Sequence, residues 1–147
     1  MRSDAAVSTL SPLVWLAEFE TGCPGIDDEH RQLLVDINAL SDLLVQGAGW
    51  LQVLDKSRQL RDKCFEHFYE EEEFLENASY DKLAAHKKEH LIVRRQLDDI
   101  LGRLGKVAVL SLVEFEAVLL LRSILLNHFF RYDILYKAHL LRQRGKN

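Results

Sequence analysis

Five histidines and two carboxylates of this chain fall at spacings that could bind metal ions. They form four elements along the chain: His30, His67-x3-Glu71, His86-x3-His90 and His128-x4-Asp133. Side chains four residues apart lie on one face of a helix, so each of the two middle pairs can reach a single point. Imidazole nitrogen and carboxylate oxygen are ligands that iron, manganese and zinc accept. One such pair arises often in helices, but all four elements together indicate a site for two metal ions.

The composition is that of one helical domain. The chain has 147 residues, enough to bury a core, of which 48% are hydrophobic and only two are proline. We expect residues 1–147 to form a single domain, with an N-terminal arm over 1–24, a helical bundle over 25–141 and a tail over 142–147.

Charge and cysteine usage exclude several classes of protein. The net charge of −4 gives no electrostatic basis for nucleic-acid binding. No apolar run is long enough to span a membrane, and no signal-peptide cleavage pattern is evident. Cys23 and Cys64 form no CxxC pair and are expected to be reduced thiols. We therefore expect a cytoplasmic protein that binds neither membranes nor nucleic acid.

Four helices are predicted from turn residues, capping patterns and apolar spacing. The predicted helices run from an N-cap at Asp27 or Asp28 to Gln46, from Trp50 to Glu76, from Tyr80 to Leu104, and, after a capping box at Ser111 and Glu114, from Leu112 to Leu141. Their short connections make neighbouring helices antiparallel, which gives an all-α, up-down-up-down four-helix bundle.

The candidate ligands lie at matching heights in such a bundle. Glu71 and His86 are seven and eight residues from the turn near Ala78. Because a helix rises by about 1.5 Å per residue, they reach the same level. The same comparison around the other two connections also gives equal heights. All four helices are therefore expected to deliver ligands to one layer of the core.

The last pair of ligands does not fit a regular helix. His128 and Asp133 are five residues apart and would point about 140° away from each other. We therefore predict a one-residue widening of the helix, a π-bulge, between them. Such distortions are frequent at functional sites.

The sequence resembles the hemerythrin family, in particular its bacterial single-domain members. The resemblance extends from about Trp15 to Tyr136 and is carried by these stretches: Thr21-Gly22, Ile26-Asp27-x-x-His30, His67-Phe68-x-x-Glu71-Glu72, Tyr80, His86-x3-His90 and His128-x4-Asp133. It implies a four-helix bundle that holds two iron ions bridged by an oxo or hydroxo group, with dioxygen as the ligand.

The resemblance also implies how the ligands are divided. One iron would be held by three histidines, the other by two, and both by two bridging carboxylates: His86, His90 and His128; His30 and His67; Glu71 and Asp133. Such a set leaves one coordination position open on a pair of octahedral ions, on the iron held by two histidines. Tyr136, one turn after Asp133, is expected to donate a hydrogen bond to the bridge.

The ligand pocket is where this chain departs from the family. Phe68 would form one wall. Family members usually have a Trp four residues before the fourth-helix histidine and an aliphatic pair after it, where this chain has Ile124, Phe129 and Phe130. These residues keep the pocket apolar, so we expect it to accept the same class of small ligand.

Three further features have structural interpretations. Glu70, Glu72 and Glu73 flank Glu71 and are expected to be structural or exposed, and His139 to lie on the surface. The fourth helix is apolar on more than one side, which indicates that either the N-terminal arm with Trp15 or a second subunit covers it.

The histidine-rich site favours reversible dioxygen binding, for carriage, storage or delivery. Its pocket offers no candidate general acid or base, so we expect no enzymatic activity beyond a weak oxidase or peroxidase reaction. Two alternatives stay open. One is an oxygen or redox sensor that acts in trans on an unidentified protein partner, and the other is an enzyme that uses peroxide, nitric oxide or ferrous iron.

Overall fold

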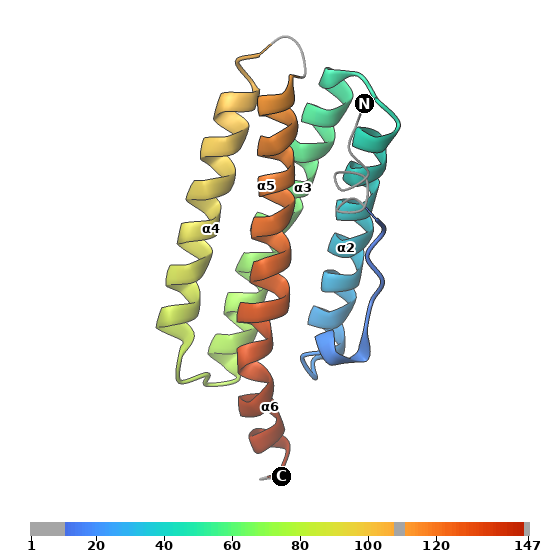
Figure 1. Cartoon of the computed structure of the whole chain (residues 1–147). Coiled ribbons are helices and arrows are strands. Elements are labelled where there is room, and N and C mark those ends of the chain that lie inside the picture. The colour runs from blue at the N-terminus through green and yellow to red at the C-terminus, as the bar shows by residue number, and fades with distance from the viewer. Residues whose placement is uncertain (1–10, 108–110, 146–147) are drawn as a thin grey trace.

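The chain folds into four long helices packed side by side. In the computed structural model, which describes residues 11–107 and 111–145, every regular element of these ranges is helical. Figure 1 shows the long helices running up and down in turn: α2 (Pro24–Val45), α3 (Trp50–Asn77), α4 (Leu83–Leu104) and α5 (Leu112–Asn127). None of the helices in the described ranges has the length and apolarity to cross a membrane. The prediction of an all-α, up-down-up-down bundle is confirmed.

Helix α2 begins earlier than its capping pattern predicts. Pro24 occupies the first turn, where the missing N–H of proline costs nothing. The prediction of an N-cap at Asp27 or Asp28 is therefore wrong. The Asp27 carboxylate lies inside the first turn and accepts hydrogen bonds from Thr21 instead.

Of the last two long helices, α4 starts later than predicted and α5 starts where predicted. Helix α4 begins at Leu83 rather than at Tyr80, because a turn precedes it. The predicted capping box at the start of α5 is confirmed, and the main-chain N–H of Ser111 donates to the Glu114 carboxylate over 3.0 Å.

The fourth helix is widened at the predicted place. The backbone forms a π-helical segment, η2 (His128–Tyr132), which confirms the predicted bulge. The extra residue brings the fifth side chain onto the same side, and Oδ1 of Asp133 lies 3.0 Å from Nε2 of His128. A 3-10 turn, η3 (Asp133–Tyr136), and a final helix, α6 (Lys137–Arg144), follow. The prediction of one continuous helix to Leu141 is therefore wrong in this stretch.

Helix α6 packs on the turn between α3 and α4. The side chains of His139 and Gln143 donate to the main-chain oxygen of Ala78 over 2.9 and 2.7 Å. These bonds satisfy a carbonyl that the end of α3 leaves without a helical partner. The prediction that His139 is a surface residue is wrong, because its ring is held between this carbonyl and Tyr80.

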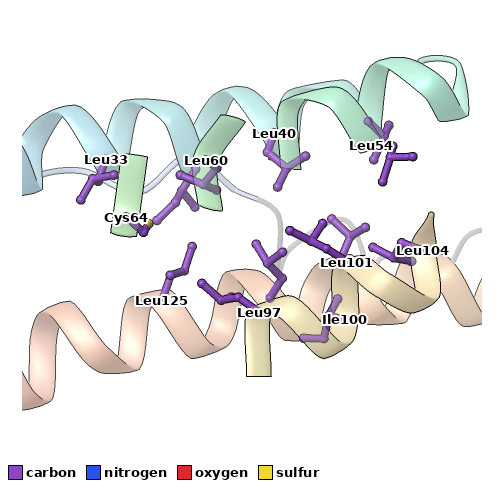
Figure 2. Close-up of a cluster of buried hydrophobic side chains, with 14 of the residues drawn as sticks. Leu33, Leu40, Leu54, Leu60, Cys64, Leu97, Ile100, Leu101, Leu104 and Leu125 are labelled. Atoms are coloured by element: carbon purple, nitrogen blue, oxygen red, sulfur yellow. The ribbon is translucent and has the colours of Figure 1, made fainter. Parts of the chain in front are cut away.

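Two apolar clusters enclose a polar layer between them. Along α2, Ile26 belongs to the smaller cluster and Leu33 to the larger one, with His30 between them. Along α3, Leu75 and Cys64 occupy the corresponding positions. Figure 2 shows side chains of the larger cluster pointing from α2 and α3 towards those of α4 and α5. Polar groups in the layer between are thus kept from water and need partners within the protein.

The described part of the N-terminal arm, residues 11–23, lies beside α2 (Figure 1). After its short turn η1 (Ala17–Phe19), Phe19 stacks on Phe130 with ring centroids 4.0 Å apart. Arg31 of α2 lies over the Trp15 ring. The arm therefore covers part of the fourth helix, while Leu120 in α5 is 49% exposed. A homodimer through α5 stays a prediction.

Candidate metal centre

The seven candidate ligands meet in the polar layer of the bundle. They come from α2, α3, α4, η2 and η3, and each side chain is at most 6% exposed. They are His30, His67, Glu71, His86, His90, His128 and Asp133. Their equal distances from the turns bring them to one level, as the sequence predicts.

The Glu71 carboxylate faces two pairs of histidines at once. Its Oε1 lies 2.5 Å from Nε2 of His86 and 3.2 Å from Nε2 of His90. Its Oε2 lies 3.5 Å from Nε2 of His30 and 3.3 Å from Nε2 of His67. Each oxygen of the Glu71 carboxylate therefore contacts a different pair of histidines.

Asp133 repeats this arrangement from the opposite side of the bundle. Its Oδ1 lies 3.2 Å from Nε2 of His86 and 3.0 Å from Nε2 of His128. Its Oδ2 lies 3.0 Å from Nε2 of His30 and 3.8 Å from Nε2 of His67. The two carboxylates thus stand between two sets of imidazoles.

The ligand atoms form two overlapping groups, each able to hold a metal ion. Within a group all ligand atoms lie within 4.8 Å of one another. The groups are Glu71, His86, His90, His128 and Asp133, and His30, His67, Glu71 and Asp133. Both carboxylates belong to both groups, which is the arrangement that a pair of bridged ions requires.

Several buried polar atoms of this cluster have no hydrogen-bond partner among the described residues. They include both carboxylate oxygens of Asp133 and Nε2 of His90 and of His128. A buried polar atom without a partner costs free energy, and most such atoms in native proteins are satisfied. A cation at the centre of each group would satisfy them, so the donor set fits metal ions.

Two carboxylates outside the seven ligands orient the histidines. Glu29 lies 3.0 Å from Nδ1 of His67, and Glu72 lies 2.7 Å from Nδ1 of His90. A hydrogen bond at Nδ1 leaves Nε2 free to bind a metal. Glu72, expected to be structural or exposed, is partly buried and has the structural role of orienting His90. The role of Glu29 was not predicted, because its spacing does not single it out.

Charge compensation within the cluster shifts the pKa values of its members. Burial alone lowers the pKa of the His86 imidazole, but its close contacts with the carboxylates of Asp133 and Glu71 raise it to about 10. Burial and the charge of Asp133 raise the pKa of Glu71, but hydrogen bonds from the imidazoles of His30, His67 and His86 hold it well below its usual value. Protons on the histidines thus balance the buried carboxylates when no metal does.

Metal uptake at neutral pH is therefore expected to release protons. The pKa of about 10 keeps His86 protonated below that pH, and the proton must leave before Nε2 can bind a metal. Metal affinity should rise with pH up to about 10 and fall as the pH is lowered. Calorimetric titration with Zn²⁺ at pH 7, in two buffers of different ionisation enthalpy, measures the release. Equal binding enthalpies in the two buffers would contradict it.

Two of the four predicted pocket residues contact the histidines. The Phe129 ring lies 5.2 Å from the ring of His30 and 5.8 Å from that of His67, between centroids. Phe68 stacks on His90 at 4.2 Å. These two rings form an apolar wall over both groups of ligands.

The other two predicted pocket residues point elsewhere. Phe130 faces the arm and stacks on Phe19, since consecutive residues of a helix point in different directions. Ile124 borders a groove on the outer surface between α4 and α5, with Ile92 and Tyr132. The prediction that Ile124 and Phe130 line the pocket is corrected accordingly.

Comparisons with known proteins agree with this geometry. A family model described as the hemerythrin HHE cation binding domain matches residues 22–139. A myohemerythrin of Theromyzon tessulatum is 30% identical over 129 residues, which are 88% of this chain and 94% of that protein. A bacteriohemerythrin of Pseudomonas paraeruginosa is 36% identical over 87 residues. That match covers 58% of this chain and 56% of the relative, so the chain spans about half the length of the bacteriohemerythrin that it matches.

A solved structure shares the fold. The crystal structure of a hemerythrin point mutant superposes with a TM-score of 0.73 and 26% sequence identity, over 87% of this chain and 96% of that one. Fold and cluster together define a four-helix bundle with a buried histidine and carboxylate site for cations. The chain belongs to the hemerythrin family, which implies that the cations are non-haem iron.

Proposed function

We propose that this chain binds two iron ions in the cluster and reversibly binds dioxygen next to the His30 and His67 side. The observation that carries the proposal is the division of the ligands. Three histidines belong to one group and two to the other, while Glu71 and Asp133 belong to both. The group with two histidines keeps room for a further ligand.

The protein around the group of His30 and His67 favours ligand binding over catalysis. Phe129 packs against both His30 and His67 and is 2% exposed, so it excludes water from the ligand position. The hydroxyl of Tyr136 donates over 3.0 Å to Oε2 of Glu71, the oxygen that faces the same two histidines. The ions would supply the electrons that dioxygen binding needs, and the protein fixes their ligands and keeps the pocket apolar.

The absorption spectrum of the reduced, iron-loaded protein tests the proposal as air is admitted and removed. We expect a visible charge-transfer band that forms with air and disappears when dioxygen is withdrawn. Irreversible conversion to the diferric spectrum without such a band would contradict reversible binding. Rapid turnover of peroxide, nitric oxide or ferrous iron would support an enzyme instead.

A sensor that acts in trans is the second candidate function. Asp133 stands at the junction of η2 and η3, and α6 follows directly, tied to Ala78 through His139 and Gln143. A shift of Asp133 on ligand binding would therefore reach α6. Amide hydrogen exchange of residues 137–144 that differs between the reduced and oxidised protein would favour the sensor, and equal exchange would count against it.

A further inference from the structure

A small surface hollow reaches one ligand of the three-histidine group. It has a volume of about 160 Å³ and lies between the start of α4 and the segments η2 and η3, with the ring of His86 in its wall. The rest of its wall is mainly apolar and includes Tyr80, Tyr132 and Leu135. This His86 hollow therefore adjoins a different metal position from the one proposed for dioxygen.

The ring of His86 has one nitrogen without a partner. Its Nε2 faces the carboxylates of Glu71 and Asp133, at 2.5 and 3.2 Å. Its Nδ1 has no hydrogen-bond partner among the described residues. Unlike Nδ1 of His30 and of His128, it is not a fully buried atom. Because the residue is only 6% exposed, the hollow is where the ring meets solvent.

Two other histidines of the centre show what this nitrogen lacks. Glu29 lies 3.0 Å from Nδ1 of His67. Glu72 lies 2.7 Å from Nδ1 of His90. A histidine that binds a metal almost always donates its second N–H to such an acceptor. When Nε2 of His86 binds a metal, its Nδ1 carries a hydrogen, and a molecule in the hollow can supply the acceptor.

The size and walls of the hollow suit a single aromatic ring. An apolar cavity of about 150 Å³ binds benzene, whereas pockets for drug-sized ligands begin near about 300 Å³. The ring of Tyr80 stands edge-on to His86 with centroids 6.4 Å apart. The ring of Tyr132 stacks on His128 at 6.2 Å. Two aromatic walls are thus held in place by ligands of the metal centre.

Glu89 determines which polar group such a ring carries. It lines the hollow one turn after His86, is half-buried, and has no hydrogen-bond or ion-pair partner among the described side chains. A hydroxyl can accept from Nδ1 of His86 and donate to the Glu89 carboxylate at the same time. A carboxylate would be repelled by Glu89, and Lys82 at the rim is exposed, so that solvent screens its attraction.

We propose that the His86 hollow binds a small phenol, whose hydroxyl lies between Nδ1 of His86 and the Glu89 carboxylate and whose ring lies against the aromatic walls. The inference goes beyond dioxygen binding, because the two ligands use different metal positions and can be bound together. It takes His86 as a metal ligand but requires neither iron nor dioxygen.

Titration of the Zn²⁺-loaded protein with phenol tests the site. NMR should show saturable chemical-shift changes confined to residues 80–89 and 132–135, together with a change at Nδ1 of His86. Anisole has the same ring without an O–H to donate, and benzoate carries a charge. Each should bind at least about fivefold more weakly than phenol. Equal binding of anisole would show an apolar hollow without recognition of a hydroxyl, and tighter binding of benzoate would show an anion site. Either result would overturn the proposal.

A pair of alanines on α4 provides a matched test of the position. Ala85 and Ala84 are both exposed, but only Ala85 lines the hollow. Ala85→Leu should fill the hollow and abolish the saturable changes, while Ala84→Leu should bind phenol like the unaltered protein. Equal phenol binding by both variants would place the ligand elsewhere and overturn the proposal. A protein that binds phenol but no dioxygen would reject only the proposed function, and one that binds dioxygen but no phenol would reject only this site.

Discussion

Replacing Glu71 with alanine is expected to abolish the binding of both metal ions. Its Oε1 faces His86 and its Oε2 faces His67, so one substitution removes a ligand from each group. Asp133 would be the one carboxylate left in both groups, so two cations would share a single negative charge. After loading and dialysis, elemental analysis should show a fall from about two ions per chain to well under one.

Glu73 provides the matched control for this experiment. It belongs to the same helix and the same run of glutamates but is exposed. Glu73→Ala should keep the full metal content. If Glu71→Ala retained one tightly bound ion, the two groups would bind metals independently, and Glu71 would not be a bridge. If both ions are lost, and with them the stabilisation that they give the fold, the result supports Glu71 as a bridging ligand.

The level of the site could be predicted from the sequence because helix geometry is regular. A constant rise per residue and short connections convert distance from a turn into height. The π segment could be predicted for the same reason, since His128 and Asp133 share a target only if the helix is widened. Spacing along a helix therefore predicts those ligands that lie on the side of the helix facing the core.

The surroundings of the ligands could not be predicted in this way. Glu29 and Glu72 directly adjoin ligands in the sequence, yet each contacts a histidine of a neighbouring helix. Those contacts depend on how far each helix is rotated in the bundle, which spacing does not fix. The same holds for Phe130, whose partner Phe19 belongs to the arm, a segment without helical periodicity.

Replacing Phe129 with alanine is expected to destabilise the fold and to shorten the life of the dioxygen-bound protein. The ring is 2% exposed and belongs to the larger apolar cluster, so truncation should cost about 3–5 kcal/mol. The space left against His30 and His67 would admit water to the ligand position. Urea unfolding of the Zn²⁺-loaded protein measures the first effect, and decay of the visible band in air measures the second.

The variant Phe130→Ala distinguishes the effect of losing the pocket wall from that of a general loss of packing. Phe130 is the next residue in the same π segment, but it is half-buried and stacks on Phe19 of the arm. Its loss should cost about 1–2 kcal/mol and leave the decay of the band unchanged. The two variants remove the same kind of side chain from adjacent positions, but Phe129 contacts His30 and His67 whereas Phe130 stacks on Phe19. Equal acceleration by both would show that the arm, rather than Phe129, keeps water from the metal centre.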